Sequence, residues 1–140
     1  MRIRRAARNW AEVWQRAWPL ADVRAIAALY APGALFFSHP FRERQTPEEY
    51  VRWAFEDQVE AECRFGEPLV EGDRAAVAWW GVIRSRDGSV ETVAGTSLLR
   101  FDEDGFVIEQ RDAWGGREGR HELPEWAVGG PPADDGRERS

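Results

Sequence analysis

The stretch RAAVAWWGVIRSRDGSVETVAGTSLLRFDEDGFVIEQRDAW, residues 74–114, decides the fold class. It consists of three long β-prone runs, and Asp-Gly dipeptides at 87–88 and 104–105 separate them. Asp-Gly is a preferred sequence for a tight turn between antiparallel strands. A Gly-Asp turn signal at 72–73 separates these runs from an earlier β-prone run. The pattern predicts four antiparallel strands, at about residues 63–71, 74–84, 90–101 and 106–114.

The sequence before these strands favours helices. Tryptophan and alanine recur every three or four residues over 7–18, which predicts one helix that Pro19 ends. A second helix is predicted from an N-cap at Asp22, with Tyr30 on its apolar face.

A short strand at 34–38 is predicted next, and then a third helix from the capping-box sequence at Thr46 to about Gln58. Helices followed by a meander predict an α+β fold, with the three N-terminal helices on the concave face of a strongly bent, mostly antiparallel sheet. Because the middle strands are unusually long, Gly81 and Gly95 are the expected bulge or bend points.

Composition excludes several function classes. The chain has 140 residues, and all 19 of its basic residues are arginines, so Schiff-base and lysine-dependent phosphate chemistry are excluded. The net charge of −6 argues against nucleic acid and anionic membranes as partners. One cysteine and two histidines offer too few soft ligands for a metal site. We therefore expect no metal and no other cofactor.

Length and segment composition indicate the domain organisation. No stretch approaches the ~20 apolar residues of a membrane span, and the N-terminus lacks the apolar core of a secretory signal. The expected location is therefore cytoplasmic. The final segment GGPPADDGRERS, residues 129–140, combines glycine, proline and mixed charge without periodicity. We expect a single domain over residues 1–128 and a flexible tail over 129–140.

The run at 75–83 is apolar on both alternating faces, with Trp79 on one face and Trp80 on the other. Helices can cover only one of these faces. A second subunit is the simplest cover for the outer face, so a homodimer through the sheet is predicted.

The last strand carries the most informative polar residues. Its even positions begin with Phe106 and end with Trp114, which predicts that this set faces the interior and carries Gln110 and Asp112 inward. Burying a carboxylate costs free energy unless the group has a cationic partner, is protonated or takes part in catalysis. Ser97 occupies a similar position among apolar residues on the preceding strand. The pattern predicts an apolar cavity with a few polar groups, as is typical of a small-molecule site.

This order of elements, with the segments LYAPGALFFSHPFR, GDRAAVAWWG, GTSLLRFDEDGFV and EQRDAW, resembles the nuclear transport factor 2-like superfamily and its SnoaL-like branch. The resemblance covers about residues 8–115. It implies a cone-shaped domain with a deep pocket that binds a small apolar or aromatic ligand and that dimerises through its sheet. Fold alone does not imply a reaction, because members of the superfamily include both enzymes and non-catalytic domains.

Two well-known mechanisms of the superfamily do not carry over to this chain. The three catalytic residue types of ketosteroid isomerase are absent at the matching positions, which hold Ser38 or His39, Trp14 and Ser97. Compared with limonene epoxide hydrolase, Asp112 matches the first aspartate, but Gly115 stands at the position of the terminal catalytic one. The SnoaL-like cyclases use an acidic pocket residue as acid and base, and Asp112 resembles that residue.

Each candidate site residue has a functional and a structural interpretation. Asp112 is either a general acid/base or the partner of an inward arginine such as Arg42 or Arg52. His39 is either a base at the rim or a loop residue that bonds its neighbours. The arginines of the loop at 42–44 either clamp an anionic group or are solvated. The candidate catalytic residues are Asp112 and His39, and the candidate substrate-binding residues are Trp14, Arg42, Trp53, Ser97, Gln110 and Trp114.

The sequence leaves three functions open. The first is a small hydrophobic-molecule-binding domain that acts as a cofactor-independent enzyme of isomerase, cyclase or hydrolase type, with Gln110 and Trp14 as hydrogen-bond donors to the substrate. The second is a non-catalytic ligand-binding domain. The third is a dimeric assembly domain whose pocket is filled by its own side chains.

Overall fold

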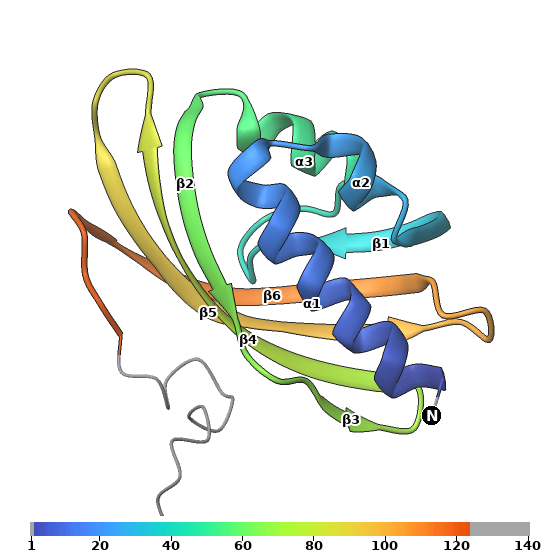
Figure 1. Cartoon of the computed structure of the whole chain (residues 1–140). Coiled ribbons are helices and arrows are strands. Elements are labelled where there is room, and N and C mark those ends of the chain that lie inside the picture. The colour runs from blue at the N-terminus through green and yellow to red at the C-terminus, as the bar shows by residue number, and fades with distance from the viewer. Residues whose placement is uncertain (1, 124–140) are drawn as a thin grey trace, which may run out of the picture.

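In the computed structural model, which describes residues 2–123, three helices lie on the concave side of a curved sheet (Figure 1). The predicted boundary at residue 128 and the predicted tail at 129–140 lie outside the described residues. The α+β prediction, with its bent and mostly antiparallel sheet, is confirmed. The elements are α1 (Arg2–Leu20), α2 (Val23–Ala27), β1 (Tyr30–Phe37), α3 (Pro47–Phe55), β2 (Gln58–Phe65), β3 (Leu69–Glu71), β4 (Arg74–Ser85), β5 (Val90–Phe101) and β6 (Val107–Glu118).

The helices differ from their predicted bounds at several ends. α1 begins five residues earlier than predicted and contains Pro19 in its last turn. α2 has only five residues, and Tyr30 is the first residue of β1 rather than part of the helix. α3 begins with the predicted capping box at Thr46 but ends at Phe55, so that Gln58 already belongs to β2.

The sheet has the strand order β1-β6-β5-β4-β2, and β3 pairs with β4 beyond the end of β2. β1 runs parallel to β6, and the other pairs are antiparallel. The run predicted as one strand at 63–71 is therefore two strands. Proline has no backbone N–H for a sheet ladder, and Pro68 lies in the gap between them.

An irregularity in the pairing of β5 with β6 sets which residues of β6 face inward. Arg100 pairs with Glu109 but Phe101 pairs with Val107, so one extra residue is inserted into β6 at this point. Gln110 and Asp112 are buried, as predicted. The reason given by the sequence is only partly right, because Phe106 is 44% exposed and lies in the turn before the strand.

The outer face of β4 is covered by the same chain. Trp80 is only 3% exposed, and its indole Nε1 donates to the backbone oxygen of His121, 2.8 Å away. Arg120 lies over the Trp80 ring and forms a two-point ion pair with Glu62 at 2.6 and 3.0 Å. A second subunit is therefore not required to bury Trp80, and the homodimer stays a prediction.

Gly81 and Gly95 are not bulges, since the pairing of β4 with β5 is continuous through both residues. Each glycine instead permits a close approach. A Cβ atom at Gly81 would lie 2.8 Å from the Trp18 ring. A Cβ atom at Gly95 would lie 2.2 Å from the backbone oxygen of Ala113 on β6, where the sheet curves around the helices. The glycine at 95 therefore allows the sharp curvature that makes the concave side deep.

We predict that Gly95→Ala lowers the free energy of unfolding by at least about 1–3 kcal/mol, because the new Cβ would collide with backbone that cannot move freely. Gly115→Ala is the matched control on the neighbouring strand, since a Cβ there meets nothing within 4 Å. Its effect should stay within about 0.5 kcal/mol. Urea unfolding followed by tryptophan fluorescence measures both, and equal effects would contradict this account of the curvature.

Candidate functional site

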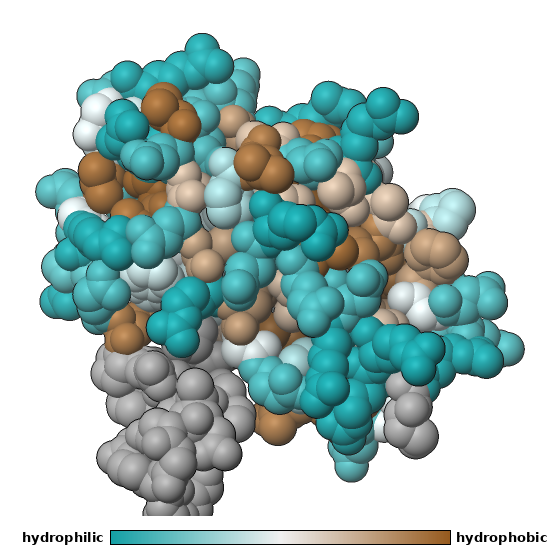
Figure 2. Space-filling view, in the orientation of Figure 1, coloured by the Kyte–Doolittle hydropathy of each residue, from teal (hydrophilic) through white to brown (hydrophobic). Residues whose placement is uncertain are grey.

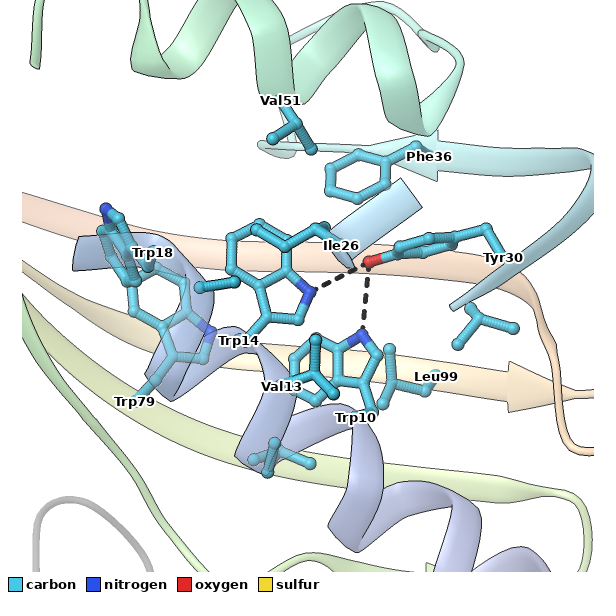
Figure 3. Close-up of a cluster of buried hydrophobic side chains, with 14 of the residues drawn as sticks. Trp10, Val13, Trp14, Trp18, Ile26, Tyr30, Phe36, Val51, Trp79 and Leu99 are labelled. Atoms are coloured by element: carbon cyan, nitrogen blue, oxygen red, sulfur yellow. Dashed lines mark hydrogen bonds between the residues drawn. The ribbon is translucent and has the colours of Figure 1, made fainter. Parts of the chain in front are cut away.

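A cavity of about 280 Å³ lies between the helices and the inner face of β4, β5 and β6. Most of its wall is aromatic. The lining residues include Trp10, Trp14, Trp18, Tyr50, Trp53, Phe55, Phe65, Trp79 and Trp114, together with the polar residues Arg42, Ser97, Gln110 and Asp112. Figure 3 shows Trp10 and Trp14 of α1 beside Tyr30, and Trp79 of β4 beside Trp18. The face of the molecule in Figure 2 is largely hydrophilic, with separate hydrophobic patches among the polar residues.

Asp112 is the acidic group within this aromatic wall. The sheet register places Ser97 of β5 directly opposite it, and the Ser97 hydroxyl donates to Asp112 Oδ1 at 2.7 Å. The Gln110 amide nitrogen donates to Oδ1 at 3.0 Å and to Oδ2 at 3.2 Å. Asp112 is 9% exposed and lines the cavity. The carboxyl group is therefore held from two sides by donors and open toward the cavity.

Three indole N–H groups set the direction of these hydrogen bonds, because an indole can only donate. Trp79 Nε1 donates to the Ser97 hydroxyl at 3.0 Å, so this hydroxyl directs its own hydrogen toward Asp112. Trp10 and Trp14 each donate to the Tyr30 hydroxyl at 3.2 Å (Figure 3).

The Tyr30 hydroxyl in turn donates to the Gln110 amide oxygen. This bond fixes the orientation of the amide and leaves the Gln110 nitrogen facing Asp112. Two chains of donors, one from α1 and one from β4, thus converge on a single carboxyl group. The other Asp112 oxygen, Oδ2, accepts only the longer hydrogen bond from Gln110. We therefore expect the proton of the neutral carboxyl group to be on Oδ2.

Burial raises the pKa of Asp112 to about 7, whereas the hydrogen bonds from Ser97 and Gln110 act in the opposite direction. Within residues 2–123, no arginine or histidine forms an ion pair with Asp112. Arg52, one of the predicted partners, pairs with Glu48 on the surface at 3.0 Å. The structural ion pair considered for Asp112 is therefore not formed, and the carboxyl group can gain or lose a proton near neutral pH.

Tyr50 adds a second polar group to the wall. Its ring stacks on Phe36 with centroids 4.6 Å apart, and its hydroxyl has no hydrogen bond to any residue within 2–123. Burial raises its pKa above the ordinary tyrosine value, and the charge of Asp112 acts in the same direction. The Tyr50 hydroxyl therefore stays protonated and can donate to a ligand.

The mouth of the cavity holds Arg42, Trp53 and Trp114. The Arg42 guanidinium carbon lies 4.9 Å from the centroid of Trp53 and 5.2 Å from that of Trp114. The Trp114 Nε1 donates to the backbone oxygen of Ser38 at 2.7 Å, which ties β6 to the loop after β1. Trp53 is 52% exposed, so its ring forms part of the entrance rather than the core.

The candidate residues do not all meet in the cavity. His39 is outside the set of lining residues, and its ring packs edge-on against Trp114 with centroids 5.1 Å apart. Its Nδ1 accepts from the backbone N–H of Phe41, as in the structural interpretation. Trp14 lines the cavity, but its N–H already donates to Tyr30. The Trp14 N–H is therefore engaged within the protein while its ring lines the cavity, and its predicted role as a donor to a substrate stays a prediction.

The sequence did not identify Tyr30, Tyr50 or Trp10 as parts of the site, and it left open whether Trp79 or Trp80 faces the cavity; the structure places Trp79 in the cavity wall. Tyr30 was assigned to the wrong element. The observed register places Trp79 and Ser97 on the same face, two residues apart along adjacent strands.

Within residues 2–123, no three His, Cys, Asp or Glu side chains lie close enough together to hold a metal ion. None of the helices in this range has the length and apolar character needed to cross a membrane.

Solved structures with the same fold have diverse assignments. A candidate aromatic ring hydroxylase from Novosphingobium aromaticivorans is 18% identical, with a TM-score of 0.69 over 84% of this chain and 93% of that one. An epoxide hydrolase/cyclase-like enzyme of pyran ring formation in the polyether salinomycin is 15% identical, with a TM-score of 0.70 over 82% and 95%. An NTF2-like protein of unknown function from an Exiguobacterium species is 17% identical, with a TM-score of 0.65 over 79% and 98%. At these identities the likeness concerns the fold.

Sequence comparison identifies the family. No curated protein matches the chain. The sequence model of the SnoaL-like domain matches residues 7–110, from α1 into β6, and so covers most of the chain. Asp112 and Trp114 lie just beyond the matched residues, so their arrangement is known from the structure alone. With this match and the cone-shaped fold together, the chain belongs to the SnoaL-like family of the nuclear transport factor 2-like superfamily.

Proposed function

We propose that this protein is a cofactor-independent enzyme that binds a small apolar molecule and moves a proton with Asp112. One observation carries the proposal: a carboxyl group with a pKa of about 7 lies in an aromatic cavity and is held only by hydrogen-bond donors. A general acid or base works best when its pKa lies near the working pH. The two carboxyl oxygens also have different roles, since Oδ1 is engaged by the protein and Oδ2 is available.

The geometry supports proton transfer next to a carbonyl group. Asp112 as the carboxylate would take a proton from the carbon beside the carbonyl, and the electron pair of the broken C–H bond would move to the carbonyl oxygen. The Tyr50 hydroxyl would donate a hydrogen bond to that oxygen, because Tyr50 lines the cavity and its hydroxyl forms no hydrogen bond within residues 2–123. Asp112 would then return its proton to another atom of the same molecule. Isomerisation would result.

Two further observations support an apolar substrate. The aromatic wall matches the cavity of a site that recognises flat or cyclic molecules. A protein with the same fold is described as an epoxide hydrolase/cyclase-like enzyme of pyran ring formation. His39 has no part in this mechanism, since it lies outside the cavity wall.

The test of this function is proton exchange with a generic ketone. 2-Tetralone has two fused rings, a size that suits the aromatic cavity, and it carries exchangeable protons on the carbons beside its carbonyl group. In D₂O, the wild-type protein should accelerate deuterium incorporation at these positions, followed by proton NMR. Asp112→Asn should reduce this acceleration by about 10²–10⁴-fold, the usual contribution of a general acid or base.

Thr92→Val is the control for this exchange experiment, because Thr92 is buried and bonds Gly119 and His121, but it neither lines the cavity nor contacts the Asp112 hydrogen-bond network. It should retain most of the exchange activity. Binding of 2-tetralone without any exchange, in the wild type and in both variants alike, would contradict the enzyme and favour the non-catalytic binding domain.

Direct titration tests the electrostatic basis of the proposal. The carboxyl carbon of ¹³C-labelled Asp112 should titrate near pH 7 by NMR, because burial raises its pKa. Ser97→Ala should raise the pKa of Asp112 further, since the Ser97 hydroxyl stabilises the carboxylate form. The other ionisable groups that line the cavity are Arg42, Tyr50, Glu56, Asp57 and Glu91, and Tyr30 lies behind Gln110. A pKa near the ordinary value of about 4 would remove the chief support for the mechanism.

The same pKa predicts how stability depends on pH. Between about pH 4 and pH 7 the folded state holds the Asp112 proton and the unfolded state does not, so the folded state loses stability as the pH rises through this window. An amide at this position stays neutral. Asp112→Asn should therefore gain stability relative to the wild type by roughly 4 kcal/mol between pH 4 and pH 8. Urea unfolding at several pH values measures the difference, and a constant difference would contradict the raised pKa.

A further inference from the structure

Arg42 is the one arginine that lines the cavity described within residues 2–123. It is half-buried, and its guanidinium lies over two indole rings at the mouth. A guanidinium has five N–H donors. One of them is engaged, by the Ser38 hydroxyl at 3.2 Å. No carboxylate within residues 2–123 pairs with Arg42.

Six other arginines within residues 2–123 do have a carboxylate partner. Arg52 on α3 pairs with Glu48, and Arg84 and Arg120 pair with glutamates of β2. A partly desolvated cation without a counter-ion is costly, and a matching anion from a ligand would offset that cost. We propose that the ligand of this cavity is an aromatic carboxylate of one or two rings, whose carboxylate is bound by Arg42 at the mouth. The inference rests on the proposed function, since it takes the same cavity as the ligand site.

The charges around the rim orient such a ligand. Glu56, Asp57 and Glu91 also line the cavity, and all three are exposed. Their charges are screened by solvent but still disfavour an anion on their side of the entrance. A carboxylate is therefore directed toward Arg42, and the ring system enters the aromatic interior toward Asp112. A phosphate dianion fits less well, because a single guanidinium would leave one of its two charges unbalanced.

The size of the cavity limits the ring system. An engineered apolar cavity of about 150 Å³ in another protein holds one benzene molecule. The present cavity of about 280 Å³ is nearly twice as large, which fits two fused rings better than a polycyclic skeleton. The aromatic walls contributed by Trp14, Phe65 and Trp79 suit the faces and edges of such rings.

The experiment compares 2-naphthoate with 2-naphthamide, a neutral molecule of nearly the same shape, by isothermal titration calorimetry with the full chain at pH 6. Wild-type protein should bind 2-naphthoate at least about tenfold more tightly than 2-naphthamide, as expected of hydrogen bonds to a charged group. Arg42→Gln should abolish this preference by weakening 2-naphthoate alone. Arg44→Gln is the matched control, because Arg44 lies on the same loop, is exposed and does not line the cavity.

The outcomes separate this inference from the proposed function. Equal affinity of the wild type for the two compounds, or an unchanged preference in Arg42→Gln, would overturn the role of Arg42 and leave the cavity as a ligand site. An equal loss of affinity for both compounds in Arg42→Gln would also overturn it, since Arg42 would then stabilise the structure of the mouth without recognising the carboxylate. Failure of both compounds to bind any variant would instead contradict the use of the cavity on which the proposed function depends.

Discussion

The hydrogen bonds that converge on Asp112 are the constraint on which the rest of the site depends. Their directions are fixed by three indole N–H groups, because the side chains of Trp10, Trp14 and Trp79 can donate hydrogen bonds but cannot accept them. The carboxyl group thus receives donors through Ser97 and through Gln110, without any cation beside it within residues 2–123. Desolvation can then dominate its pKa, while the donors prevent the carboxylate form from being prohibitively costly.

This arrangement needs several elements to be in register. Ser97 and Asp112 are opposite each other only because β5 and β6 pair without interruption from residue 100 to the far end of β5. The irregularity that precedes this region is what turns the polar residues of β6 inward. α1 must also lie close to the sheet, and the missing side chain at Gly81 allows its Trp18 ring to do so. Tryptophan in α1 is therefore part of both the core and the site.

Local patterns in the sequence predicted most of the fold and the polar part of the site. Turn signals located the long strands, and period-two alternation correctly turned Gln110 and Asp112 inward. The errors arose where tertiary contacts override local spacing. Tyr30 fits the apolar face of a helix, yet its hydroxyl is needed as the acceptor for two indoles of α1 and it lies in β1.

Other features depend on segments that are distant in the sequence and could not be inferred locally. The cover over Trp80 comes from His121 and its neighbours, which follow the last predicted strand and carry no periodic pattern. The position of His39 depends on how the loop after β1 packs against Trp114. The alternation of one strand likewise could not show that Asp112 lacks an arginine partner, because Arg42 and Arg52 reach their positions through a loop and a separate helix.

The loop that carries Arg42 at the cavity mouth and the segment after β6 are held in different ways. The segment after β6, which covers the outer face, is attached to β5 through Gly119 N–H, which bonds to Val90, and through His121 N–H, which bonds to the Thr92 hydroxyl. The loop of Arg42 is closed by the bond from Arg42 to the Ser38 hydroxyl and by an isolated bridge between Phe36 and Gln45, and Trp114 joins it to β6 by one hydrogen bond to the Ser38 backbone oxygen. A small displacement of this loop would therefore open the mouth at the cost of that one hydrogen bond and of the ring contacts with Trp114. A guest that enters there meets Arg42 first and the proton of Asp112 last.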